Sequence, residues 1–384
     1  FRRVLFRSRW LIRARVVADA GRCGVSKKYF KHARAVREGV AKKTSAEKMK
    51  AFGWSVLVAG VAVTPAFGCD LCAVYSSAEA RGEMGRGFFG GVSEQFTHYG
   101  SLQYNGNNVA NDLHQFMDSS MSQVFVGYNF AHRIGVQVNV PLIYRSWQRL
   151  DEGTRLLERG RTRGVGDVSV TLNWTPVQHQ HKSGIVRWSV LGGVKLPTGN
   201  SHGNLAPELG ESADKIADEE REKSDAFAAG NLGSKMGGIH DHDIALGSGS
   251  VDGIFGTSVY ASWNRFFATA SIQYSLRTKG DFDYRFGDDL IWAAGPGYML
   301  VAKEKFTLSL QARASGEYKM KDDVRGLTDP DSGMTSVFVG PQLEVSWNEK
   351  YNLSVGADLP VHVNATSFQS VPDYRVRAAF TVRF

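Results

Sequence analysis

The chain has 384 residues, of which 42 are Gly, 22 Phe, 13 Tyr and 8 Trp, and its formal net charge at pH 7 is +8. Residues 1–50 hold 16 Lys and Arg against three acidic residues, so the rest of the chain carries a net negative charge. This distribution excludes nucleic-acid binding by the body of the protein. A hydrophobic content of 42% excludes a disordered chain, and the Gly and aromatic content favours β-structure over helix.

Residues 49–68 have the pattern of a secretory signal peptide. A short basic start precedes an apolar core over residues 54–63, and the small residues Ala66 and Gly68 stand where a signal peptidase requires them. The uncharged stretch is borderline in length for a membrane helix, so a retained helix is the alternative. Its internal Gly and Pro residues favour cleavage after Gly68.

The segments on either side of this signal peptide are expected to lie outside the main fold. Residues 1–48 would be a non-native upstream segment, with an Arg-rich transit peptide as the weaker alternative. Residues 69–84 would be a periplasmic N-terminal segment that carries Cys69 and Cys72. This spacing predicts a disulfide in an oxidising compartment, with lipidation of Cys69 as an alternative. A c-type haem would need His where Ala73 stands.

From residue 85 onwards, polar and apolar residues alternate with a period of two. Phe306, Leu308 and Leu310 share one face of a segment, and Ser309 and Gln311 share the other. Alternation over this length predicts half-buried strands. Twelve segments show it: 86–104, 119–131, 133–147, 165–176, 185–197, 250–263, 266–278, 288–302, 305–319, 333–347, 351–363 and 371–384.

Connections between these segments are alternately short and long. The long ones are 105–118, 148–164, 198–249, 279–287, 320–332 and 364–370. With an even strand number, this pattern predicts an all-β protein: a transmembrane antiparallel up-and-down β-barrel of about 12 strands over residues 85–384. Both termini and the short turns would face the periplasm, with 198–249 as a long extracellular loop. A soluble sandwich would show neither this alternation nor such long strands.

Aromatic residues and the C-terminus both point to the bacterial outer membrane. Trp residues near the ends of the predicted strands would form interfacial girdles in outer-membrane lipid; they are Trp147, Trp174, Trp188, Trp263, Trp292 and Trp347. Apolar residues recur at alternate positions back from the terminal Phe384. This ending resembles the strand that the outer-membrane assembly machinery recognises, so that machinery is an expected partner through Phe384.

Three short motifs carry a family resemblance: Gly164–Trp174 (GVGDVSVTLNW), Gly193–Gly199 (GVKLPTG) and Leu246–Gly253 (LGSGSVDG). Together they resemble the outer-membrane barrels described as transporters or meta-pathway phenol-degradation proteins, over about residues 85–384. The resemblance implies a barrel and passage of small or hydrophobic solutes. It implies no catalytic residues.

Phe306 and Leu308 are expected to face the lipid, so the side chains on the opposite face of each strand are expected to point into the lumen. Its cations are Arg145, Arg187, Lys195, Arg277, Arg313, Arg375, Arg377 and Arg383, and its anions are Asp167, Glu317, Glu344 and Asp358. All of these except Asp167 and Arg383 form the predicted pore-lining set. The excess of cations predicts a preference for anionic solutes. The alternative is that these charges pair across neighbouring strands and fill a narrow interior.

Two His-x-His pairs stand out. His240 and His242 lie beside acidic residues in the long loop, a pattern that predicts a Zn or Cu site, with a solvated polar loop as the alternative. His179 and His181 repeat the spacing in a short turn at the other end of the barrel. No cofactor is expected otherwise.

The sequence predicts an outer-membrane channel for passive diffusion of small solutes, anionic or aromatic ones included. The alternative is a structural or partner-binding barrel without an open pore. An enzyme is not expected, because Ser354 and His362 share a strand but lie eight residues apart on its predicted inner face, too far apart for a Ser–His pair.

Overall fold

A computed structural model describes residues 86–131, 133–151, 154–205 and 212–384. The predicted upstream segment, the signal peptide and the Cys69–Cys72 pair all lie outside these residues. None of the helices in the described part of the chain is long and apolar enough to cross a membrane.

Twelve strands of 11 to 18 residues form the main sheet. They are β1 (Gly87–Tyr104), β3 (Phe116–Ala131), β4 (Ile134–Leu150), β6 (Ser169–His181), β7 (Gly184–Lys195), β8 (Asp252–Trp263), β9 (Phe266–Leu276), β11 (Asp289–Lys303), β12 (Phe306–Lys319), β15 (Met334–Trp347), β16 (Tyr351–Ala365) and β17 (Phe368–Arg383).

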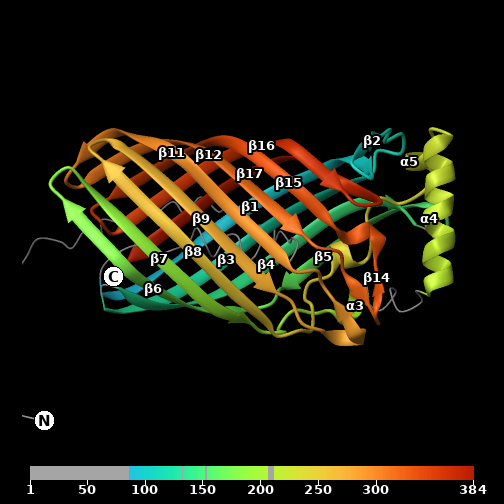
Figure 1. Cartoon of the computed structure of the whole chain (residues 1–384), viewed down its shortest axis with the longest axis horizontal. Coiled ribbons are helices and arrows are strands. Elements are labelled where there is room, and N and C mark those ends of the chain that lie inside the picture. The colour runs from blue at the N-terminus through green and yellow to red at the C-terminus, as the bar shows by residue number, and fades with distance from the viewer. Residues whose placement is uncertain (1–85, 132, 152–153, 206–211) are drawn as a thin grey trace, which may run out of the picture. The chain divides into compact units, whose positions relative to one another are not determined.

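The sheet closes on itself. Each of these strands pairs antiparallel with the next one along the chain, and β17 pairs with β1 from Phe89 opposite Arg383 to Tyr104 opposite Phe368. Figure 1 shows the resulting barrel of inclined strands. The predicted antiparallel up-and-down barrel of about 12 strands is therefore confirmed.

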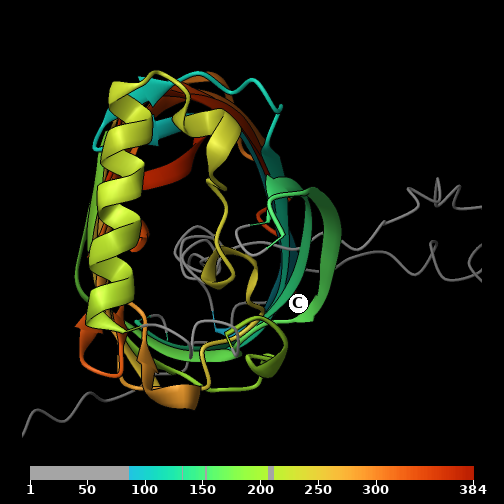
Figure 2. The same cartoon turned by 90° about the vertical axis from the view of Figure 1, so that its right-hand side faces the viewer.

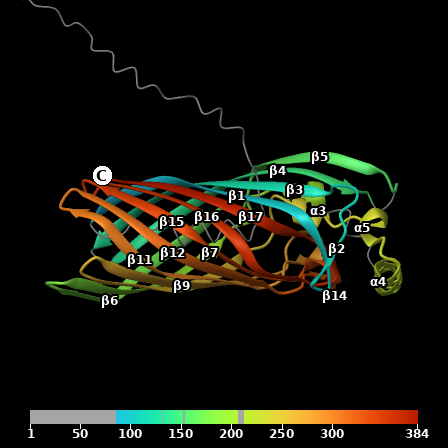
Figure 3. The ribbon, with the colours of Figure 1, turned by 90° about the horizontal axis from the view of Figure 1, so that it is seen from above.

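Smaller elements gather at one end of the barrel (Figure 3). There β2 (Asn107–Val109) pairs with β1, and β5 (Leu157–Val165) extends the sheet beside β4. A separate three-stranded sheet consists of β10 (Tyr284–Arg285), β13 (Asp323–Val324) and β14 (Leu327–Thr328). The helices are α3 (His202–Leu205), α4 (Ala213–Ala228), α5 (Leu232–Lys235), η2 (His242–Ile244), η3 (Asp281–Asp283) and η4 (Pro330–Ser332).

The two ends of the barrel differ in their connections. At one end, called here the turn end, consecutive strands are joined by two or three residues, as at 264–265, where Asn264 adopts a positive φ of 53°. The opposite end, the loop end, carries the connections 105–115, 151–168, 196–251, 277–288 and 320–333. The last loop-end connection differs from the prediction of a longer loop at 364–370. β16 and β17 extend into it, and only residues 366–367 remain between them.

Side chains alternate between the two faces of the barrel as the sequence predicts. In β12, Phe306 and Leu310 are exposed on the outer surface, whereas Ser309, Gln311 and Arg313 are buried in the interior. Because lipid tails offer no hydrogen bonds, an apolar outside and a polar inside suit a barrel in a membrane.

The prediction that Trp147 belongs to an aromatic girdle on the outer surface is wrong. Its side chain is buried inside the barrel against Met117 and Ile239, whereas Trp263 and Trp347 lie exposed at the turn end. The physical reason is parity: Trp147 lies two residues after Arg145 on β4, so both side chains point inward.

Leu310→Arg tests the assignment of the outer face. Arg at a lipid-facing site should lower the free energy of unfolding by about 2–4 kcal/mol near the middle of the bilayer. The measurement is urea unfolding of the barrel in lipid vesicles, followed by tryptophan fluorescence. Glu304→Arg, in the turn between β11 and β12, adds the same side chain outside the apolar belt. It should lower the free energy of unfolding by less than about 1 kcal/mol. Equal losses in both variants would contradict the assignment.

Candidate functional site

Four of the predicted pore-lining residues meet on the wall formed by β12, β15, β16 and β17. Arg377 and Asp358 form a two-point ion pair, with Nε to Oδ2 at 2.7 Å and Nη2 to Oδ1 at 3.0 Å. Arg375 Nη2 lies 3.8 Å from Glu317 Oε2, and its guanidinium stacks 4.1 Å from the centre of the Phe338 ring.

Arg313 joins this group through a shared amide. Arg313 Nη1 and Arg377 Nη1 both donate to Oε1 of Gln342, at 3.2 and 3.0 Å. Three guanidinium groups therefore face two carboxylates, Glu317 and Asp358. This cluster, called here the arginine wall, has a formal excess of one positive charge.

A second charged group lies at the loop end, where β7, β8, β9 and β11 begin or end. Lys195 Nζ lies 2.9 Å from Asp167 Oδ2 and 2.7 Å from Asp252 Oδ2. Arg277 bridges Asp252 at 3.1 Å and Asp289 at 3.0 Å. All five side chains are buried, and the three carboxylates exceed the two cations.

The remaining predicted pore residues have other surroundings. Arg187 stacks over the Tyr260 ring at 5.5 Å, and Glu344 accepts a hydrogen bond of 2.7 Å from Asn352. Arg145 donates from Nη1 to the carbonyl of Ala245 at 3.1 Å. The structure thus divides the predicted set into two clusters and three separate positions. The pairing across neighbouring strands that the sequence left open occurs in both clusters.

The second half of the connection between β7 and β8 runs inside the barrel opening. Residues 236–250, called here the inner segment, follow α5 and cross the loop end in Figure 2. Ile239 and Ile244 pack on Met117 and Trp147 of the wall, and Leu246 packs on Ile143.

Polar side chains of the wall hold the backbone of the inner segment. Gln115 accepts from the N–H of Gly238 at 3.1 Å and donates to the carbonyl of Met236 at 2.9 Å. Arg149 donates to the carbonyl of Ile239 at 3.3 Å and pairs with Asp241 at 2.8 Å. An irregular segment in a closed space needs such partners, because unpaired buried peptide groups are costly.

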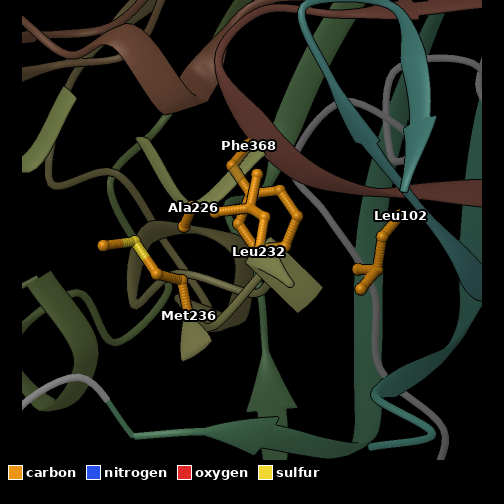
Figure 4. Close-up of a cluster of buried hydrophobic side chains, with 5 residues drawn as sticks. All are labelled: Leu102, Ala226, Leu232, Met236 and Phe368. Atoms are coloured by element: carbon orange, nitrogen blue, oxygen red, sulfur yellow. The ribbon is translucent and has the colours of Figure 1, made fainter. Parts of the chain in front are cut away.

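Helix α4 lies along one side of the same opening (Figure 2). Ser212 caps its N-terminus by accepting from the N–H of Lys215. Ala226 and residues of α5 pack with Leu102 and Phe368 of the wall, and Figure 4 shows this cluster. The contact fixes α4 and α5 to β1 and β17, and with them the start of the inner segment.

Lys223 of α4 makes a buried ionic contact with the loop between β12 and β15. Its ammonium group lies against Asp331 and 3.0 Å from Oε1 of Glu220. Burial alone would lower the pKa of Lys223, but the attraction of the two carboxylates outweighs it and raises that pKa above its ordinary value.

The predicted metal ligands His240 and His242 lie in the inner segment, and the structure brings distant carboxylates to them. Asp243 is a neighbour in sequence, whereas Asp329 and Asp331 come from the loop around η4. Sequence analysis did not single out these two residues, although loop 320–333 is visibly rich in Asp. The other pair, His179 and His181, is exposed near the turn end, with its Nε2 atoms 2.8 Å apart.

No known protein family and no curated protein matches this chain by sequence. In structure, it resembles an outer-membrane channel from Pseudomonas putida F1, with 14% sequence identity, a TM-score of 0.53, and coverage of 78% of this chain and 96% of that chain. A weaker likeness is to the translocator domain of the autotransporter NalP from Neisseria meningitidis, with 11% identity, a TM-score of 0.35 and coverage of 82% of this chain and 93% of that chain. The closed barrel and the likeness to the Pseudomonas putida channel show that the chain has the fold of a bacterial outer-membrane channel. Membership of the phenol-degradation family stays a prediction.

Asp358→Asn tests the arginine wall. The change removes one of two carboxylates facing three guanidinium groups and should lower the free energy of unfolding by about 3 kcal/mol. Chemical unfolding in detergent micelles measures the loss. Glu222→Gln is the matched control, because it breaks an exposed pair with Arg155 and should cost less than about 1 kcal/mol. If Asp358→Asn costs no more than the control, the pair does not stabilise the barrel.

Proposed function

We propose that this protein is a bacterial outer-membrane channel through which small solutes diffuse passively, with a preference for anions. One observation supports a channel above all. The closed barrel is apolar outside and lined inside by polar residues, among them Gln95, Gln123, Gln137 and Gln311. Buried polar side chains need hydrogen-bond partners, which interior side chains, water or polar solutes supply, so a polar interior of this kind is compatible with the passage of polar solutes.

Orientation follows from the same architecture. In bacterial outer-membrane barrels the short turns face the periplasm and the long loops face outwards. We therefore assign the turn end, with Phe384, to the periplasmic side. The inner segment and α4 would then lie at the extracellular opening, where a solute enters.

The arginine wall supports the anion preference. Its net charge of one positive unit comes from Arg313, Arg375 and Arg377 against Glu317 and Asp358. Basic side chains on a narrow wall favour anions, because the low-dielectric barrel concentrates their field in the lumen. The loop-end cluster around Lys195 has the opposite excess, so selectivity would be set at the arginine wall, below the opening.

A barrel without an open pore is the second candidate. The inner segment and the paired charges favour it, since both occupy interior space. Conductance distinguishes the two candidates, because a closed structural barrel passes no ions even when it is correctly folded.

The first test is conductance of the full chain, exported to the outer membrane of a bacterial host, purified and reconstituted in planar bilayers. We expect discrete single-channel steps and a reversal potential in a salt gradient that favours anions. Arg313→Gln should reduce the anion preference, because it removes the excess charge of the arginine wall. Arg163→Gln, on the exposed strand β5, removes the same charge outside the lumen and should leave the preference unchanged. A folded barrel without conductance would favour the closed barrel.

A second test concerns the inner segment. Replacing residues 200–249 with a short Gly-Ser linker should raise the single-channel conductance several-fold, since the inner segment crosses the opening. A control variant replaces only the first turns of α4, residues 213–219, with a flexible linker and keeps Lys223, Ala226 and the inner segment. That control should conduct nearly as the original protein does. Unchanged conductance in the first variant would show that the inner segment does not obstruct the pore.

A further inference from the structure

We propose that His240, His242 and Asp243 bind a divalent transition-metal ion such as Zn²⁺, in a site that the loop around η4 completes. The site goes beyond the proposed channel function, because it would fix the inner segment to the barrel whatever solute passes. Imidazole nitrogen and carboxylate oxygen are the donors that Zn²⁺ and its neighbours prefer in proteins.

The three side chains converge. One ligand atom from each of His240, His242 and Asp243 lies within 4.8 Å of the other two. Nδ1 of His240 is 3.7 Å from Oδ2 of Asp243, and Nε2 of His242 is 3.5 Å from its Oδ1. Both histidines therefore direct one ring nitrogen towards the same carboxylate.

These spacings suit an ion better than direct hydrogen bonds. A charge-assisted N–H···O hydrogen bond brings its heavy atoms to about 2.7–2.9 Å. Around a tetrahedral ion with ligand bonds of about 2.0–2.1 Å, neighbouring ligand atoms lie about 3.4 Å apart. The separations of 3.5 and 3.7 Å, which run to the two oxygens of Asp243, lie close to that value.

The second nitrogen of each histidine faces a carboxylate of the η4 loop. Nδ1 of His242 lies 3.4 Å from Oδ2 of Asp329, and Nε2 of His240 lies 3.9 Å from Oδ2 of Asp331. In metal sites a carboxylate commonly orients the imidazole from behind and strengthens it as a donor. The geometry at Asp329, His242 and Asp243 matches this arrangement.

The charge balance around the two histidines suits a bound cation. Asp331 already faces Lys223, and Asp241 already faces Arg149. Asp322, which also lies within 4.8 Å of His242, already faces Lys319, and Asp243 and Asp329 approach His242 at 3.5 and 3.4 Å. Two neutral imidazoles and these two carboxylates complement an ion of charge +2.

The ligands are also held in place before any ion arrives. The N–H of His240 donates to Oδ2 of Asp243 at 3.0 Å. Ile239 and Ile244, on either side of the ligands, pack on Met117 and Trp147. Because the ligands lose little freedom on binding, the site is preorganised in the way tight metal sites require.

Binding of Zn²⁺ to the full chain, purified without a polyhistidine tag and stripped of metal with a chelator, tests the proposal. Isothermal titration should give one tight site per chain. His242→Gln should weaken that site at least 100-fold, and Asp329→Asn should weaken it about 10–100-fold through loss of the orienting carboxylate. Replacement of Zn²⁺ by Co²⁺ should give the intense visible absorption of a four-coordinate ion.

The double variant His179→Gln/His181→Gln is the matched control. It removes a pair with the same spacing near the turn end, which lacks the facing carboxylates, and should keep the tight site. Asp243→Asn provides a second variant at the site if His242→Gln does not fold, as judged by heat-modifiable electrophoretic mobility. The proposal is wrong if the unmodified protein binds no Zn²⁺ tightly, or if folded His242→Gln and Asp243→Asn variants keep the tight site.

Discussion

Backbone hydrogen bonding between β1 and β17 is the constraint on which the rest of the structure depends. A strand edge facing lipid would expose peptide groups that have no partner there, at a cost of several kcal/mol for each group. The register from Phe89–Arg383 to Tyr104–Phe368 removes that edge over nearly the whole length of both strands. Once the barrel is closed, every strand has a fixed inner and outer face. Each side chain on a strand then lies either in the barrel interior or on the outer surface.

The strands and their two faces could be predicted from the sequence because a period of two is a local signal. Arg313, Arg375 and Arg377 could be assigned inwards from parity alone. Their partners could not be predicted with the same precision, because Glu317 and Asp358 come from strands whose relative register depends on the whole barrel. The sequence therefore predicted an excess of interior charge and left its pairing open.

The wrong prediction of a loop at 364–370 also arises from contacts between distant parts of the chain. Residues 364–370 contain no strong strand pattern, yet β16 and β17 extend until only Thr366 and Ser367 remain between them. The N–H of Ser367 is bound by Asn105, and that of Phe368 by Asp331. Such contacts from distant parts of the chain stabilise extended backbone that local pattern does not reveal. Likewise, the spacing of His240 and His242 was visible in the sequence, but the arrival of Asp329 and Asp331 beside them was not.

The inner segment gives two interior arginines a structural role in addition to their charge. Arg145 and Arg149 would each contribute to the field of an empty lumen, yet both donate hydrogen bonds to carbonyls of this segment. Those hydrogen bonds do not neutralise the guanidinium charge; they fix its position and satisfy peptide groups that the closed space would otherwise leave unpaired. Arg145 can therefore hold an irregular segment in the opening and keep its own charge, whereas the charge of Arg149 is also balanced by its ion pair with Asp241. A structural role and an electrostatic role are compatible here, because a carbonyl accepts a hydrogen bond without cancelling the charge of its donor.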